Sequence, residues 1–218
     1  MGSSRNRRNS NSTEAAALLE AIEKVALEYP SYGVRRITAM LHRSGIAAVN
    51  RKQDITYIWC GHDGWCYLFS ILDCYTREWL AYTFSTYCGT DEAIRTLEMA
   101  VLERFPDRIV PLPPHSGLAI RSDGGSQYTS DRFISTLKVY GIRHEVTGKN
   151  RPDHNAYIEA FHKSIKEDCI WQHDFQTFQE ADLVICKFFH DYNWNRPHSS
   201  LKYMTPKEFY AMINGGNN

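Results

Sequence analysis

The 218-residue sequence lacks the features that mark a membrane-spanning or exported chain. No apolar run approaches the roughly 20 residues that a helix needs to cross a bilayer. The opening stretch MGSSRNRRNSNS has no apolar core, so it does not resemble a secretory signal. It instead predicts a disordered basic tail over residues 1–12, and we expect no contact with membranes.

The cysteines also lack a pattern that would give them a structural or metal-binding role. No two of the six are spaced as CxxC, which argues against both a zinc knuckle and a disulfide framework. A reducing, cytoplasmic setting is therefore the expected location. The six are Cys60, Cys66, Cys74, Cys88, Cys169 and Cys186.

The chain has no excess charge of either sign, because 25 Lys and Arg balance 25 Asp and Glu. The two parts of the chain nevertheless differ. Residues 1–53 hold nine basic and four acidic side chains, net +5, and residues 54–218 hold 16 and 21, net −5. A basic arm on an acidic body is typical of a DNA-handling segment attached to a metal-using catalytic domain. Short N-terminal segments are also often basic without a function, so charge alone leaves both interpretations open.

The pattern of residues near the N-terminus predicts two short helices. The stretch STEAAALLEAIEKVALEYP is rich in helix formers and ends at Pro30, and VRRITAMLHRSG follows the turn SYG. This pair is compatible with a helix-turn-helix and equally with any helical hairpin. A DNA reader also needs a helix that enters the major groove. We assign residues 13–53 to a shortened helix-turn-helix-like segment, in which 47–53 lead directly into a strand that begins at Asp54.

From Asp54 onward the pattern changes to alternating strands and helices. Three consecutive strands with short connections predict an antiparallel meander, and two further strands each arrive through a helix. The α/β body over 54–218 is therefore expected to be a mixed five-stranded sheet flanked by helices. The expected strands are 54–60, 65–73, 77–86, 118–123 and 142–146, and the expected helices are 91–105, 130–141, 156–172, 178–196 and 205–213.

Three carboxylates stand at positions where such a sheet places functional groups. Asp54 opens the first strand, Asp123 ends the fourth before two glycines, and Glu159 lies early in a helix. If the first and fourth strands are neighbours, the three meet at one edge and form an oxygen-rich site suited to Mg²⁺. Each signal is weak alone, since such residues are usually caps, turn formers or solvated charges. Asp73, at a hairpin turn, is interpreted as a turn former.

The interpretation of these three carboxylates as one site is strengthened by a resemblance to a known family. With 35 residues between Asp123 and Glu159, the three acids resemble the DDE signature of retroviral-integrase-like transposases. The stretches DITYI, YLFSILDCYTREWLAYTF, RSDGGSQYTS, NAYIEAFHKSIKED and YNWNRPHSSLKYMTP resemble, in order, motifs of bacterial insertion-sequence transposases encoded by a second reading frame. The resemblance covers roughly residues 14–210. It implies a ribonuclease H-like fold, two Mg²⁺ or Mn²⁺ ions held by Asp54, Asp123 and Glu159, and double-stranded DNA ends as substrate.

The resemblance also predicts DNA contacts and an assembly. Lys163 and Lys166 lie four and seven residues after Glu159, on the same helix face, and the family pattern places them near phosphates. Asn155 matches a polar position near the DNA end. The family further implies a homo-oligomer assembled on DNA.

One departure from the family lies at residues 46–58, IAAVNRKQDITYI. Related chains continue from NRK through a helix and a basic linker to a strand with a tryptophan a few residues before the first Asp. Here Gln53 adjoins Asp54 directly, and Arg51 or a neighbour stands in the tryptophan's place.

The expected function is metal-dependent strand cleavage and strand transfer in transposition. The alternatives are a catalytically silent, internally deleted remnant that binds DNA or an intact transposase, and a cellular ribonuclease H-type nuclease, which the motifs NRPHSSL and TPKEF disfavour.

Overall fold

The computed structural model describes residues 49–106, 118–146 and 156–215. The chain divides into two compact units, one of residues 1–48 with 115–118 and one of the remainder. The predicted basic tail and the two predicted N-terminal helices lie outside the described residues. Within the described ranges, no helix has the length and apolarity needed to cross a membrane.

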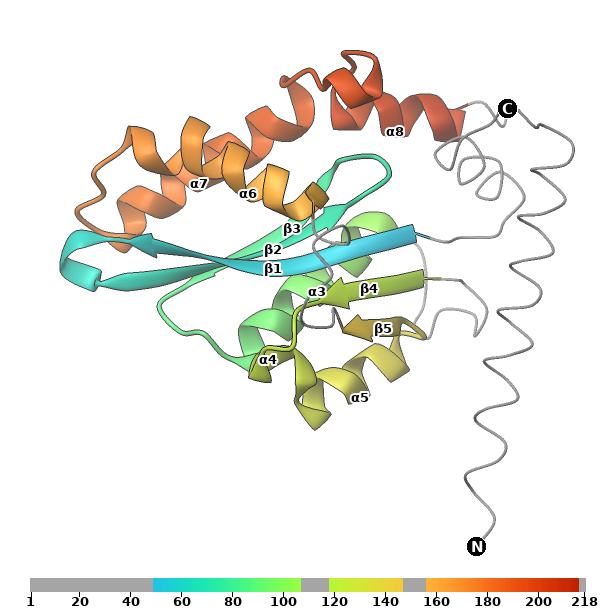
Figure 1. The fold of residues 1–218 in the computed structure, drawn as a ribbon, viewed down its shortest axis with the longest axis horizontal. Coiled ribbons are helices and arrows are strands. Elements are labelled where there is room, and N and C mark those ends of the chain that lie inside the picture. Colours follow the sequence, from blue (N-terminus) through green and yellow to red (C-terminus); the bar gives the residue numbers. More distant parts are fainter. Residues whose placement is uncertain (1–48, 107–117, 147–155, 216–218) are drawn as a thin grey trace, which may run out of the picture. The chain divides into compact units, whose positions relative to one another are not determined.

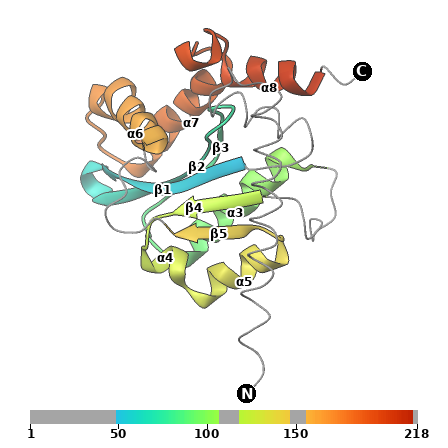
Figure 2. The ribbon, with the colours of Figure 1, turned by 45° about the vertical axis from the view of Figure 1, so that its right-hand side comes forward.

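The centre of the second unit is a mixed five-stranded sheet (Figure 1). The strands lie in the order β3-β2-β1-β4-β5, so β1 is hydrogen-bonded to β4 as well as to β2. β1, β2 and β3 form an antiparallel meander, and β4 and β5 run parallel. The first and fourth strands, which the sequence analysis treated as possible neighbours, are adjacent in the sheet (Figure 2). The strands are β1 Val49–Trp59, β2 Trp65–Asp73, β3 Trp79–Ser85, β4 Leu118–Ser122 and β5 Arg143–Val146.

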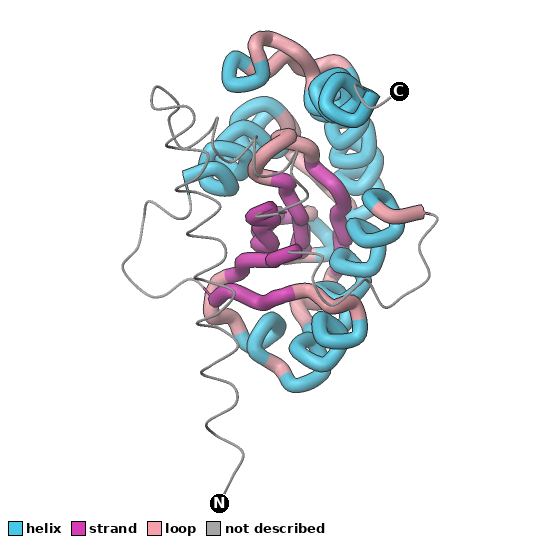
Figure 3. Tube along the Cα trace, turned by 90° about the vertical axis from the view of Figure 1, so that its right-hand side faces the viewer, coloured by secondary structure: helices cyan, strands magenta, loops and turns pink. Residues whose placement is uncertain are grey.

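Helices cover both faces of this sheet (Figure 3). One buried cluster joins the sheet to α6 and α7 and centres on Trp79, and the other joins it to α3, α4 and α5 and centres on Phe69. Strands with two buried faces are expected where helices lie on both sides. The α-helices are α3 Thr90–Arg104, α4 Ser126–Thr129, α5 Asp131–Val139, α6 Ala156–Asp168, α7 Phe178–Trp194 and α8 Pro206–Gly215. Three-residue 3₁₀ turns stand at η1 Gly61–Asp63, η3 Ile170–Gln172 and η4 Ser199–Leu201.

The first strand starts earlier than the sequence predicts, because β1 begins at Val49 and not at Asp54. Residues 51–53 pair in register with β2. Gln53 is fully buried, and its Nε2 donates a hydrogen bond of 2.9 Å to the carbonyl oxygen of Ala93 in α3. These tertiary partners compensate for the low strand preference of the polar residues. The segment that was expected to be a connector therefore belongs to the sheet, and Asp54 lies in the middle of a strand.

A cluster of buried charges fixes the hairpin between β2 and β3. Asp73 forms the turn as predicted, since its Oδ1 accepts the N–H of Tyr75 at 2.9 Å. Its other oxygen contacts Arg104 of α3 at 3.0 Å, and Arg104 also pairs with the buried Glu78 at 2.8 Å. Lys207 of α8 reaches Glu78 at 2.6 Å. The cluster thus joins the meander to α3 and to the last helix.

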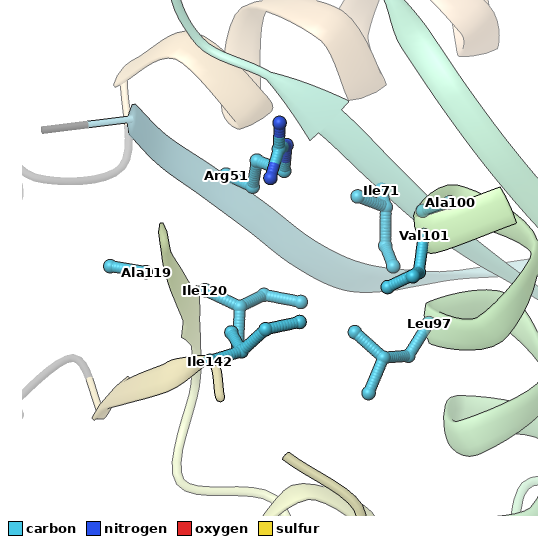
Figure 4. A pocket seen from close by; sticks show the side chains of 8 residues that line it. All are labelled: Arg51, Ile71, Leu97, Ala100, Val101, Ala119, Ile120 and Ile142. Atoms are coloured by element: carbon cyan, nitrogen blue, oxygen red, sulfur yellow. The ribbon is translucent and has the colours of Figure 1, made fainter. Parts of the chain in front are cut away.

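Arg51 lies beside this cluster and beside a small cavity (Figure 4). The cavity measures about 10 Å³, room for one water molecule at most. Apart from Arg51, aliphatic side chains from β2, α3, β4 and the segment before β5 surround it, as Figure 4 shows. They are Ile71, Leu97, Ala100, Val101, Ala119, Ile120 and Ile142. This cavity is a packing gap of the core and not a ligand site.

Candidate active site

Asp54 is held in β1 opposite Ser70 of β2. One carboxylate oxygen, Oδ1, accepts the backbone N–H of Ile55 at 2.8 Å. The other, Oδ2, lies 3.5 Å from Nδ1 of His162 on α6. The pKa of Asp54 is raised to about 6, mainly by burial and also by the negative charges of Asp123 and Glu159, against the opposing effects of the Ile55 N–H and of Lys166.

Asp123 follows the last residue of β4 directly. Its Oδ1 accepts the N–H of Gly125 at 3.0 Å, which shapes the turn that leads into α4. Because β4 is the neighbour of β1, Asp123 follows a strand adjacent to the one in which Asp54 lies. The charge of Asp123 acts on Asp54 and contributes to its raised pKa.

Glu159 lies in the first turn of α6 and is exposed. The helix is anchored over the sheet by Ile158, Phe161 and Ile165, which are buried in the cluster around Trp79. This packing turns the apolar face of the helix toward the sheet, and Glu159 contributes to the raised pKa of Asp54. Of the three carboxylates predicted from sequence, Asp123 and Glu159 both act electrostatically on Asp54. Among the described residues, however, no three His, Cys, Asp or Glu side chains are close enough to enclose a metal ion by themselves.

The predicted DNA contacts differ in their setting. Lys166 is half-buried and acts electrostatically on both Asp54 and His162. Lys163 is 71% exposed and pairs with Glu167 one turn further along the helix at 3.7 Å. Asn155 lies outside the described residues.

Two residues that the sequence analysis did not select also border Asp54. Burial, helped by the charge of Lys166, lowers the pKa of His162 to about 4, so this imidazole is neutral at pH 7. Tyr128 of α4 is fully buried, and its hydroxyl has no hydrogen-bond partner among the described residues. Burial and the nearby charges of Asp54 and Asp123 raise the pKa of Tyr128 well above its usual value. The spacing of three between Glu159 and His162 is a helical-face signal that could have found the histidine.

The comparison with protein families matches two integrase core domain descriptions, at residues 52–152 and 140–206, and an HTH-like domain at residues 13–53. The HTH-like match coincides with the segment assigned from the sequence. Most of that segment lies outside the described residues.

Curated relatives are proteins of bacterial insertion sequences. The transposase of IS904 from Lactococcus lactis is 34% identical over 157 residues, which are 72% of this chain and 58% of that protein. A protein of IS407 from Burkholderia multivorans is 37% identical over 93 residues, 34% of its length. The chain thus spans 58% or less of these two relatives. The InsD transposase of IS2 from Escherichia coli is 25% identical, with 93% of this chain and 81% of that protein covered. That alignment has 247 positions, more than the chain has residues, so it contains gaps in this chain.

Solved structures confirm the fold. A chain of the simian T-cell lymphotropic virus intasome, solved with the PP2A regulatory subunit B56 gamma, gives a TM-score of 0.59 at 17% identity, covering 76% of this chain and 55% of that chain. The HTLV-2 integrase catalytic core domain in complex with magnesium gives 0.54 at 15% identity, covering 75% and 97%. The body therefore has the ribonuclease H-like fold of retroviral integrase cores. Since the two integrase core matches together extend over residues 52–206, this chain belongs to the integrase core domain family, with transposases of insertion sequences as its relatives.

Proposed function

We propose that this chain is the catalytic body of a DDE transposase that cleaves DNA strands at the ends of a mobile element and joins them to target DNA. The observation that supports the proposal is the electrostatic effect of Asp123, directly after β4, and of Glu159, in the first turn of α6, on the buried Asp54 in β1. In cleavage, a water oxygen bonds to phosphorus as the bond to the leaving 3′-oxygen breaks. In strand transfer, the freed 3′-hydroxyl attacks a target phosphodiester in the same way, without a covalent protein–DNA intermediate.

The three carboxylates are the residues that would hold two Mg²⁺ or Mn²⁺ ions. They fit such ions chemically, because they offer oxygen ligands only and because Asp54 is buried with two like-charged neighbours whose repulsion a cation would relieve. Divalent ions held there supply activation of the attacking oxygen and stabilisation of the leaving oxygen. No three potential ligands lie close enough to enclose a metal ion among the described residues. Because the Glu159 side chain is exposed, it is free to move and complete the ligand set.

The remaining side chains of the site orient these groups. The N–H of Ile55 fixes one oxygen of Asp54, and the neutral imidazole of His162 faces the other. Lys166, which acts electrostatically on Asp54, would contact the phosphate that reacts, and the proposal assigns DNA contacts further along to Lys163 and Asn155. Relatives in this fold class act as assemblies on DNA, and we include a homo-oligomer in the proposal.

The direct test is strand transfer of a 3′-hydroxyl oligonucleotide into plasmid DNA, with Mn²⁺ or Mg²⁺ present. Asp54→Asn, Asp123→Asn and Glu159→Gln should each reduce the rate by more than the 10–100-fold typical of a partner outside the ligand set. Glu98→Gln removes an exposed carboxylate on α3 and serves as the matched control. Mn²⁺ titration followed by electron paramagnetic resonance should show weaker binding in the two Asp variants. Undiminished strand transfer by Asp54→Asn would contradict the assigned role.

The lysines are tested by the salt dependence of DNA binding. Lys163→Ala and Lys166→Ala should each weaken binding to any sequence, because a phosphate contact is sequence-independent. Each lost contact should reduce the slope of log affinity against log salt by about 1. An unchanged slope in both variants would leave these lysines as ordinary surface charges.

A second candidate function is that of a catalytically silent remnant that binds DNA or an intact transposase. The observation that favours it is the junction: β1 begins at Val49, so only residues 47 and 48 remain of the segment expected to separate the N-terminal helices from the strand. A third helix has no residues there, and the gapped alignment agrees with a loss of chain. The full chain should then bind a terminal repeat and a scrambled duplex equally, in the range of about 10⁻⁴–10⁻⁶ M. A preference of about 10³-fold or more for the repeat would show a complete reader.

A further inference from the structure

A depression of about 520 Å³ lies next to the candidate active site, between the hairpin of β1 and β2 and the end of α6. We call it the aromatic recess. Ten of the described residues line it, among them four exposed aromatic side chains, one lysine and one aspartate, and its volume suits a small ligand. These six residues are Tyr57, Trp59, Trp65, Trp171, Lys166 and Asp174.

The aromatic side chains of the recess are unusually open to solvent. Tyr57 is 59% exposed, Trp59 52%, Trp65 55% and Trp171 68%. Single exposed apolar residues are ordinary, but a contiguous group around a depression marks a binding surface. The rings therefore present apolar area that a flat ligand can cover.

The recess is continuous with the candidate active site. Lys166 lines it and also acts on the carboxylate of Asp54. Tyr57 lines it as well, and the charges of both Asp54 and Asp123 act on its hydroxyl. A DNA strand whose phosphate is engaged at the carboxylates passes Lys166 and reaches the rings with its next nucleotides.

The walls of the recess are held together before any ligand arrives. Trp59 and Trp65 pack edge to face across the hairpin, with ring centroids 5.3 Å apart. The hairpin is tied to the segment that follows Trp171, because the N–H of His62 donates to the carbonyl oxygen of Gln176 at 3.0 Å. A preformed site loses less conformational entropy on binding.

We propose that the aromatic recess holds an unpaired nucleobase of the DNA strand engaged at the carboxylates. Bases stack on aromatic rings whatever their sequence, whereas a base inside a duplex has its faces covered. Lys166 would contact the phosphate of that nucleotide, and the carboxylate of Asp174 would accept a hydrogen bond from an exocyclic amine of the base. A groove for duplex backbone alone would need several cations, and Lys166 is the one Lys or Arg among the described residues that line the recess. The inference rests on the proposed function and specifies the form of DNA that the site takes.

The test uses the full chain and three DNAs: a blunt duplex and the same duplex with a three-nucleotide 5′ or 3′ overhang that carries 2-aminopurine. Trp59→Ala and Trp171→Ala should weaken binding of one overhang duplex by about 5- to 150-fold, the loss of one base–ring stack. They should also abolish the quenching of 2-aminopurine, with blunt-duplex affinity unchanged within about twofold. Trp171→Phe should restore most of the affinity. Trp194→Ala, at an equally exposed tryptophan outside the recess, is the matched control.

Three outcomes would overturn the inference. Equal losses for blunt and overhang duplexes, or no loss for either overhang, would show that the rings bind no unpaired base. A Trp variant that alters only the sedimentation of the protein would identify a second copy as the occupant. If one of these results is found while blunt DNA binds and strand transfer depends on Asp54, only the recess has been misinterpreted and the proposed function stands. If no DNA binds at all, the proposed function fails, and this inference fails with it.

Discussion

Replacing Arg51 with methionine should stabilise the body, although it removes a buried ion pair. The Arg51 side chain is 11% exposed, its Nε lies 3.8 Å from Asp73, and that Nε has no hydrogen-bond partner among the described residues. Burial, assisted by the charge of Arg104, lowers the pKa of Arg51 against the opposing effect of Asp73. Asp73 does not depend on Arg51, since Arg104 and two backbone N–H groups already contact it. The charge of Arg51 is therefore poorly compensated.

The size of the effect follows from these contacts. Replacing buried ions with apolar groups of similar volume stabilises proteins by about 1–4 kcal/mol in favourable cases, and we expect about 1–2 kcal/mol here. Methionine is flexible enough to fill the small cavity beside Arg51. In a chain of this length that gain corresponds to a rise in melting temperature of about 2–8 °C. Asp73→Asn should do the reverse and cost about 3–5 kcal/mol, because it leaves two buried guanidinium groups facing a neutral side chain.

Urea denaturation followed by circular dichroism and tryptophan fluorescence measures both changes, with the m-value as the check that the unfolding transition is unchanged. The reasoning is refuted if Arg51→Met lowers the free energy of unfolding by more than about 1 kcal/mol. Such a loss would mean that the ion pair with Asp73 is a net stabilising contact. A neutral effect of Asp73→Asn would equally contradict the view that this carboxylate compensates the buried cations.

Three further changes test other contacts by the same measurement. Asn193→Ala should cost about 2–4 kcal/mol, because the Asn193 amide accepts from the N–H of Trp79 at 3.0 Å and donates to its carbonyl oxygen at 2.9 Å; a loss under about 0.5 kcal/mol would contradict this. Gly61→Ala should cost about 1–3 kcal/mol more than Gly64→Ala, since both have positive φ but only the methyl group at 61 would meet a backbone oxygen, at 2.6 Å. Equal losses would exclude that clash. Tyr128→Phe should raise the free energy of unfolding by about 1 kcal/mol, because the buried hydroxyl has no hydrogen-bond partner among the described residues; destabilisation would reveal a partner.

Much of the fold could be predicted because its signals are local. The strand Trp65–Asp73 has the predicted bounds, as its apolar run ends at the residues that form the turn. The order of strands followed from the lengths of the connections. The start of β1 could not be predicted, because residues 51–53 have polar side chains and are held by β2 and α3, which come later in the sequence. The helix predicted to run to residue 172 ends at Asp168, because Cys169 and Ile170 turn into the core.

The candidate site also has residues that could be predicted from the sequence and residues that could not. A shared site of Asp54 and Asp123 could be proposed from the sequence, because the two residues belong to strands that were possible neighbours. The importance of Tyr128 and His162 depends on how deeply each is buried beside those carboxylates, and spacing does not report burial. The aromatic recess was also out of reach, because Trp59 and Trp171 meet only after the chain between them has folded.

The wide sequence separation of Trp59 and Trp171 affects how the protein folds during synthesis. The hairpin is joined to the start of α7 by hydrogen bonds that close a separation of 115 residues, such as the one from the Phe178 N–H to Asp63 at 2.6 Å. Contacts between residues so distant in sequence form late, whereas the β1–β2 hairpin is local. A ribosome releases the hairpin long before it has made residue 178. Until then Trp59 and Trp65 stand on a hairpin with no opposite wall, so an emerging chain exposes these apolar rings and completes the recess only after residue 178 has been made.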